Sequence, residues 1–227
     1  MRLKNKIKIF IFARGNSKGI KNKNLTLIKG RPLIYYSIKI AKEITSIENI
    51  YLSSDSDAIC RKAHAYGVNT IKRPKKLALD KTPEILAWKH AIKHLNRIKI
   101  DFDVFVSLPP TSPLRTKKDV MLTIKKLRGK TDIVLTASHA ERNPRFNMVK
   151  KMKNKFYDII ISGKRIFNRQ QAPKYFDLNT VAFVTKPSYI LKCNSIFDGN
   201  VDINIVSKKS SIDIDDLHDL KVARSLI

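Results

Sequence analysis

Short apolar runs alternate along the chain with longer stretches in which apolar residues recur every three or four positions. The short runs are typical of buried strands, and the longer stretches are typical of amphipathic helices. The strands that this pattern predicts are residues 7–13, 50–53, 69–72, 103–108, 132–137 and 181–185. The predicted helices are residues 32–43, 55–66, 82–95, 117–127 and 216–225. The Thr82 hydroxyl is expected to cap the third of these helices. This alternation predicts an α/β fold, with a mostly parallel, twisted sheet and helices on both faces.

Residues 139–176 interrupt the alternation with a polar region that contains a possible hairpin around residues 151–161. We therefore expect one domain over residues 1–227, with an inserted region at 139–176 that covers the site or pairs with a second subunit. Ligands of such sheets bind beyond the carboxyl ends of the strands. The loops of greatest interest are those after residues 13, 53, 108 and 215.

The chain has 46 Lys and Arg against 19 Asp and Glu, which gives 227 residues a formal net charge of +27. Phosphate backbones attract Lys and Arg, so this charge raises the possibility of nucleic-acid binding. The basic residues are spread along most of the chain, however, and no zinc-finger, basic-zipper or RNA-recognition motif is present. We expect a solvated lysine-rich surface, no specific nucleic-acid partner, and a positive cleft that attracts small anions.

The two cysteines, Cys60 and Cys193, stand alone, outside any CxxC or Cys/His metal spacing. Ordinary thiols in a reducing cytoplasm are the simplest interpretation. The apolar runs are far shorter than the ~20 residues that span a bilayer, and the basic N-terminal segment lacks the apolar stretch of a signal peptide. We therefore expect a cytoplasmic protein without a membrane partner.

The loop at residues 14–24 follows the first strand and combines two glycines, a hydroxyl, three amides and four cations. Backbone N–H groups beside glycines can approach phosphate oxygens, while Lys and Arg share the negative charge. The pattern is neither GxxxxGK[ST] nor GxGxxG, so the P-loop and Rossmann interpretations fail. The loop is a candidate for holding a polyphosphate, and a plain lysine-rich surface loop is the alternative.

Asp213 and Asp215 lie two residues apart on a segment that we expect to be extended. Side chains of an extended segment alternate between faces, so both carboxylates point the same way, roughly 7 Å apart. Two such carboxylates can share Mg²⁺, which prefers one or two carboxylates together with substrate phosphates. The alternative is that Asp215 or Asp216 only caps the following helix. Beside a phosphate-binding loop, we favour metal binding.

Two more loops contain candidate residues. Residues 107–115 end a strand and hold three prolines within five positions, which suits either a rigid wall beside a ligand or a simple turn capped by Thr111 or Ser112. Arg169, within residues 168–173 of the inserted region, is a candidate for contact with an anionic group, although a single Arg in a polar loop is commonly just solvated.

Four motifs, in this order, resemble those of the N-acylneuraminate cytidylyltransferases, also called CMP-sialic acid synthetases. They are ARGxSKGxxxKN at residues 13–24, TSPLR at 111–115, RQxxP at 169–173 and IDID at 212–215. The resemblance covers essentially the whole chain. It implies a single domain of the nucleotide-diphospho-sugar transferase type, usually a homodimer in which the inserted region reaches across to the partner. The implied reaction transfers CMP from CTP to a sugar acid and releases pyrophosphate.

The resemblance also assigns residues to roles. The implied nucleotide-binding residues are Arg14, Ser17, Lys18, Lys23, Asn24 and Arg73, of which Arg73 is near the cytosine. The implied catalytic residues are Asp213, Asp215, Lys18 and Arg169. Asp213 and Asp215 are also the implied ligands of Mg²⁺ or another divalent cation.

Three positions depart from the family pattern. Pro109 stands where many members have a Gln that contacts the sugar, Asp177 replaces a second arginine, and Glu84 replaces a serine near the ribose. The CTP half is therefore retained while the acceptor half differs. We expect a nonulosonic acid of the legionaminic or pseudaminic kind, with a shorter, Kdo-like ulosonic acid as the alternative. A basic nucleic-acid-binding protein that has lost its activity is the alternative from another class.

Overall fold

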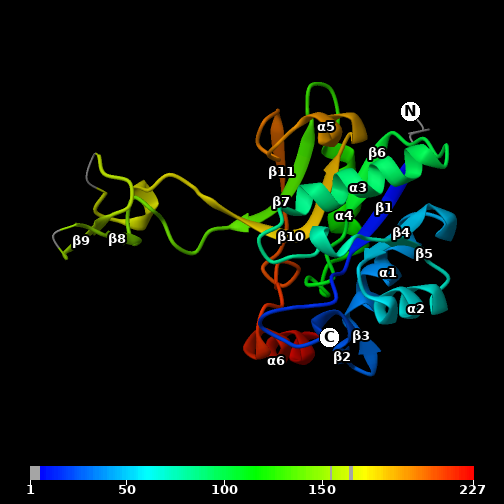
Figure 1. Ribbon diagram of the computed structural model, residues 1–227. Coiled ribbons are helices and arrows are strands. Elements are labelled where there is room, and N and C mark those ends of the chain that lie inside the picture. The colour runs from blue at the N-terminus through cyan, green and yellow to red at the C-terminus, as the bar shows by residue number, and fades with distance from the viewer. Residues whose placement is uncertain (1–5, 154, 164–165) are drawn as a thin grey trace.

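The computed structural model describes residues 6–153, 155–163 and 166–227, and a seven-stranded sheet lies at its centre (Figure 1). In spatial order the strands are β11 (Val201–Ile205), β7 (Ile133–His139), β10 (Phe176–Thr185), β6 (Val104–Ser107), β1 (Ile7–Phe12), β4 (Ile50–Ser54) and β5 (Asn69–Lys72). Among the described strands, neighbours are parallel except for β10, which is antiparallel to β6 and β7. The predicted mostly parallel α/β sheet is confirmed.

Helices cover both faces of the sheet, as the alternating pattern predicts. On one face lie α1 (Leu33–Ile44), α2 (Asp57–Ala65) and α4 (Lys117–Lys126). On the other face lie α3 (Glu84–Arg97) and α5 (Pro187–Lys192). Aromatic rings fill this second layer, where Phe105 lies 4.6 Å from Phe10 and 5.4 Å from Trp88 between ring centroids. These two buried layers hold the sheet rigid, because burial of large side chains is the main stabilising term in folding.

A third, smaller apolar cluster lies where the chain ends, against the first loop. Here α6 (Leu217–Leu226) packs beside the short ribbon of β2 (Leu27–Ile28) and β3 (Arg31–Pro32) (Figure 1). Its buried members include Ile20 from the loop after β1 and Ile214 from the segment before α6. One apolar cluster therefore anchors both segments that the sequence singles out for phosphate and metal binding.

The inserted region projects from the body as an arm (Figure 1). It forms the antiparallel hairpin of β8 (Val149–Lys151) and β9 (Tyr157–Ile159), passes through the 3₁₀ turn η4 (Arg169–Gln171) and returns into β10. The hairpin agrees with the prediction. Several large apolar side chains on the arm are exposed: Met148, Val149, Met152, Phe156, Tyr157 and Phe167.

None of the described helices is long and apolar enough to cross a membrane.

The strands nearest the arm differ from the prediction. β10 begins at Phe176 instead of Val181, because its first half pairs with the end of β7 at the root of the arm. The hydrophobic pattern also misses α5 and the edge strand β11. Residues 212–215 are not part of any strand; they form an extended connection that leads to α6.

Two predicted helix caps are wrong. The Thr82 hydroxyl donates to the carbonyl of Lys76 over 3.0 Å, so α3 begins at Glu84 without a side-chain cap. α4 is capped by Thr116, whose hydroxyl accepts from the backbone N–H of Asp119 in a reciprocal capping box. The hydroxyls proposed as its caps are used elsewhere, since that of Ser112 contacts Thr180 over 2.6 Å.

Candidate active-site cleft

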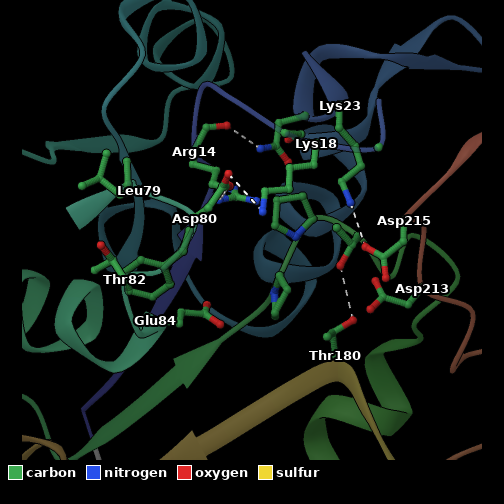
Figure 2. Close-up of a pocket in the computed structure, with 18 of the residues that line it drawn as sticks. Arg14, Lys18, Lys23, Leu79, Asp80, Thr82, Glu84, Thr180, Asp213 and Asp215 are labelled. Carbon is green, nitrogen blue, oxygen red and sulfur yellow. Dashed lines mark hydrogen bonds and ion pairs between the residues drawn. The ribbon is translucent and has the colours of Figure 1, made fainter. Parts of the chain in front are cut away.

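A cleft of about 600 Å³ opens at the carboxyl ends of the strands (Figure 2). Three of its walls are the loop after β1, residues 73–84 after β5 and residues 109–111 after β6. Thr180 of β10 and the two aspartates Asp213 and Asp215 complete the lining. The volume lies in the range of small-molecule sites. The loops after residues 13 and 108 line it as expected, whereas near residue 215 the lining residues are Asp213 and Asp215 themselves. The expectation for the loop after residue 53 is wrong, because the connection after β5 takes its place.

The structure brings together nearly all the site residues that the sequence suggests. The residues of this set that line the cleft are Arg14, Ser17, Lys18, Lys23, Asn24, Arg73, Asp213 and Asp215. Arg169 belongs instead to η4 on the projecting arm, and its side chain lies outside the described part of the structure. Glu84 and Pro109 also line the cleft. Asp177 pairs with Ser138 in the sheet at the root of the arm.

Alternation along the extended segment orients the two aspartates. Ile214 is fully buried in the apolar cluster beneath α6, and its N–H donates to the carbonyl of Thr111 over 2.9 Å. Asp213 and Asp215 therefore turn to the opposite side, into the cleft, as predicted. Asp216 is the residue that caps α6, through bonds from the N–H groups of His218 and Asp219. Capping and cleft lining are thus divided between neighbouring aspartates.

Lys23 joins the first loop to this segment. Its ammonium donates to the carbonyl of Ile214 over 2.6 Å and lies 3.0 Å from a carboxylate oxygen of Asp215. The Lys23 side chain is only 12% exposed, whereas that of Asp215 is 80% exposed. Gly19 lets the backbone of the first loop approach the backbone of Asp215 closely, because a Cβ at position 19 would lie 2.0 Å from the carbonyl oxygen of Asp215.

Asp80 pairs with two further cations of the loop. Its carboxylate lies 2.6 Å from Nη1 of Arg14 and 3.3 Å from Nζ of Lys18. Desolvation alone would raise the pKa of Asp80, but the hydrogen bonds from Arg14 and Lys18 outweigh it and hold the pKa below its usual range. Nothing in the residue pattern marks Asp80, since its partners are 66 and 62 residues away in the chain.

The lining of the cleft carries no excess of cations over carboxylates, which differs from the expectation of a positive cleft. Four cations and four carboxylates line the cleft. They are Arg14, Lys18, Lys23 and Arg73 against Asp80, Glu84, Asp213 and Asp215. The net charge of +27 resides elsewhere on the surface, because the cleft's cations are balanced by carboxylates from distant parts of the chain.

Arg73 has donors without partners. Its side chain is 5% exposed, and neither Nε nor Nη2 has a hydrogen-bond partner among the described residues. The nearest carboxylate, that of Asp55, is 3.9 Å from Nη2 and also accepts from the N–H of Gly15 over 2.9 Å. Desolvation lowers the pKa of Arg73, and the charge of Asp55 opposes that shift. Buried donors that lack acceptors are costly, so Arg73 is suited to a ligand that supplies acceptors.

Arg115 fixes the wall opposite the loop, a role that the sequence does not indicate. It is fully buried and donates to the hydroxyl of Ser37 and to the carbonyls of Pro109 and Thr180. Desolvation lowers the pKa of Arg115 to about 9, against the opposing charge of Asp213. These bonds hold the backbone of Pro109 and the irregular part of β10, where the register shifts after Asn179, in one rigid wall.

Glu84 begins α3 and faces the cleft. Oε1 of Glu84 accepts from Nε1 of Trp88 over 3.2 Å. The residue as a whole is exposed and lines the cleft. Desolvation of its carboxyl group raises the pKa of Glu84, and the nearby charge of Asp213 adds to the shift, whereas Trp88 and Arg73 oppose it.

Comparison with known proteins shows the family to which this fold and cleft belong. The chain matches the family model described as Cytidylyltransferase over residues 9–211. It is 33% identical over 221 residues to the CMP-N,N'-diacetyllegionaminic acid synthase of Campylobacter jejuni, covering 96% of this chain and 93% of that protein. It is 28% identical over 225 residues to an N-acylneuraminate cytidylyltransferase of Escherichia coli, covering 97% of this chain and 52% of that protein.

The structure of a CMP:2-keto-3-deoxy-manno-octonic acid synthetase complexed with CTP shares the fold, with a TM-score of 0.72 at 14% identity and coverage of 97% and 98% of the two chains. This chain belongs to the cytidylyltransferase family. The resemblance inferred from the four ordered motifs is confirmed.

We predict that Gly19→Ala loosens the segment before α6, because the added methyl group collides with the backbone of Asp215. Amide hydrogen exchange over residues 212–219 should accelerate. Gly129→Ala is the control, since a Cβ there meets nothing within 4 Å, although its φ of +58° is itself strained. Equal exchange in the wild type and in Gly19→Ala would show that the loop does not press on Asp215.

We predict that Glu84→Gln becomes more stable relative to the wild type as pH rises. Because the folded pKa is raised, the favourable contribution of Glu84 is complete below its unfolded pKa and is lost as pH rises through the folded value. Thermal unfolding of both proteins from pH 4 to 8 should give a difference in melting temperature that grows from near zero. Glu48→Gln should trend the other way, since hydrogen bonding from Ser46 lowers the pKa of Glu48. A flat difference for Glu84→Gln would contradict the assignment.

Proposed function

We propose that this cytidylyltransferase transfers CMP from CTP to the anomeric hydroxyl of a nonulosonic sugar acid and releases pyrophosphate. The observation that carries the proposal is one cleft that holds both the cationic loop after β1 and the paired carboxylates of Asp213 and Asp215. The names of the relatives, which include a legionaminic acid synthase and an N-acylneuraminate cytidylyltransferase, support an acidic sugar as the acceptor.

In this proposal the loop after β1 holds the triphosphate. Arg14, Ser17, Lys18 and Lys23 contact phosphate oxygens. Asn24 contacts the nucleotide while it keeps the loop closed, since its side-chain amide donates to the carbonyl of Arg14 over 2.8 Å. The charge-assisted hydrogen bonds from Arg and Lys to phosphate oxygens are about twice as strong as neutral ones.

Arg73 suits recognition of the base. Its unfilled donors match a pair of neighbouring acceptors, and the N3 and O2 atoms of cytosine are such a pair. In uracil the N3 position carries a hydrogen and would face Arg73 with a second donor. The geometry therefore supports CTP over UTP as the nucleotide.

Asp213 and Asp215 are the proposed ligands of Mg²⁺ or another divalent cation. Oδ1 of Asp213 is buried and has no hydrogen-bond partner among the described residues, which suits an atom that coordinates a cation. The described residues contain no group of three or more His, Cys, Asp or Glu placed to hold a metal. The remaining ligands would be substrate phosphates and water, which is the usual pattern for Mg²⁺. When bound, the cation would neutralise phosphate charge and polarise the attacking hydroxyl.

The protein's own residues position the reactants. The sugar hydroxyl oxygen attacks the α-phosphorus and its proton passes to solvent. The bond to the bridging oxygen of the β-phosphate breaks, and pyrophosphate leaves in line. Arg14 and Lys18 neutralise the charge that develops on the leaving pyrophosphate, and Lys23 keeps the loop against Asp215. Orientation and charge neutralisation supply the rate acceleration without a nucleophilic side chain.

We also propose a cytoplasmic homodimer in which residues 139–176 form the interface. The exposed apolar side chains on the arm support this, because isolated proteins rarely leave such a surface uncovered. Arg169 would then act in the cleft of the partner. Both cysteines, Cys60 and Cys193, are free thiols, which supports a reducing compartment.

The reaction is tested by incubating the protein with CTP, Mg²⁺ and a panel of acidic sugars: legionaminic, pseudaminic, N-acetylneuraminic and Kdo acids. Pyrophosphate release with at least one of them is expected. Asp213→Asn and Asp215→Asn should each lower kcat about 100-fold or more, because charge neutralisation at the phosphates is lost. Asp57→Asn is the control, since Asp57 pairs with Lys72 outside the cleft. No release with any acceptor, or full activity of Asp213→Asn, would contradict the proposal.

The shared site is tested by mixing two inactive variants, Arg169→Ala and Asp213→Asn. If Arg169 serves the partner's cleft, each mixed dimer regains one complete site, and random pairing restores about a quarter of wild-type activity. The dimer itself is measured by analytical ultracentrifugation. A monomer, or a dimer that regains nothing on mixing, would overturn this part of the proposal.

A further inference from the structure

Asp80 occupies the place in the cleft where an anionic ligand would be held. Its two carboxylate oxygens are divided between two cations: Oδ1 lies 2.6 Å from Nη1 of Arg14, and Oδ2 lies 3.3 Å from Nζ of Lys18 (Figure 2). One carboxylate therefore bridges two cations that come from a single loop, much as one phosphate group would bridge them. The reaction proposed above gives no role to Asp80.

The charge of Asp80 opposes the binding of a polyphosphate. A triphosphate that contacts Arg14 and Lys18 while Asp80 remains paired with them would place phosphate oxygens beside a carboxylate. Like charges at such short distances repel, and the pKa of Asp80 is already held low by its two cations, so protonation at neutral pH does not relieve the conflict. Either the carboxylate withdraws or the phosphates stay away from these cations.

The backbone around Asp80 permits withdrawal. Asp80 lies at the tip of a turn in which the N–H of Thr82 donates to the carbonyl of Leu79 over 3.0 Å. The turn connects the 3₁₀ helix η3 (Lys75–Leu77) to α3 and belongs to neither a strand nor an α-helix. The Leu79 residue is 61% exposed, and the Asp80 side chain is 42% exposed. Moving the tip therefore breaks few buried contacts.

We propose that Asp80 is a specificity-determining residue, an internal anion that pairs with the cations of the phosphate site and that an incoming polyphosphate must displace. This inference rests on the proposed function, since it takes the loop after β1 to be the triphosphate site. Ligands that engage both Arg14 and Lys18 bear the cost of breaking two ion pairs. Ligands with a single phosphate bound elsewhere in the cleft do not bear it. When pyrophosphate leaves, Asp80 returns to the two cations.

The opposite role would be that of a positioning residue. Asp80 would then keep Arg14 and Lys18 correctly oriented and would remain beside them when the nucleotide binds. Removal of the Asp80 carboxylate distinguishes the two roles, because they predict opposite changes in the affinity for polyphosphate. Loss of a competitor tightens polyphosphate binding, whereas loss of an orienting partner weakens it.

The experiment is titration calorimetry of the full-length protein with CTP, inorganic tripolyphosphate and CMP, without acceptor sugar. Asp80→Asn should bind CTP and tripolyphosphate about five- to ten-fold more tightly than the wild type, the scale of two partly exposed ion pairs. Binding of CMP should change less than about two-fold. Asp80→Glu should remain near the wild type because it retains the charge. Asp57→Asn, which removes an exposed carboxylate paired with Lys72, is the control and should change nothing.

Weaker or unchanged binding of tripolyphosphate to Asp80→Asn would overturn the inference, and so would equal tightening by CMP. Wild-type pyrophosphate release with CTP and an acceptor would leave the proposed function standing in that case. Conversely, tighter tripolyphosphate binding by Asp80→Asn in a protein that releases no pyrophosphate would support the role of Asp80 and reject the proposed reaction.

Discussion

The cleft depends on the contact between two segments that lie almost the whole chain apart. Gly19 and Lys23 come from the loop after β1, and they meet the backbone and carboxylate of Asp215. Ile20 and Ile214 share the apolar cluster beneath α6, so burial holds the contact in place. Because both segments are anchored by apolar side chains, their charged neighbours are left facing the cleft. A polar site is thus positioned by hydrophobic packing directly below it.

Charge is distributed differently over the surface of the protein and over the lining of the cleft, so long-range attraction of anions and their binding in the cleft depend on different residues. The chain carries a net charge of +27, yet the cations that line the cleft are matched by carboxylates. A basic surface draws anions towards the protein at long range and is screened by salt. Inside the cleft, three of the cations are already paired with carboxylates, so an anionic ligand there competes with groups of the protein itself. Net charge alone therefore says little about the site.

The sequence predicted the features that local patterns encode. The parallel strands other than β11 follow from short apolar runs, and the alternation of Ile and Asp at residues 212–215 correctly predicted the direction of both carboxylates. Asp80 and Arg115 escaped prediction because their partners are distant in the chain and no spacing rule connects them. The Thr82 cap failed since a tertiary acceptor, the Lys76 carbonyl, competes for its hydroxyl. Local preference thus gave the framework, while tertiary contacts decided the balance of charge.

β10 gives the molecule a mechanical link between its arm and its cleft. The strand begins at the root of the arm, runs through the irregular register after Asn179 and continues into the centre of the sheet. Thr180, at the irregularity, lines the cleft, and its carbonyl is held by Arg115. One continuous backbone therefore joins the root of the arm to the wall of the cleft, so the arm and the wall share a single element of the sheet.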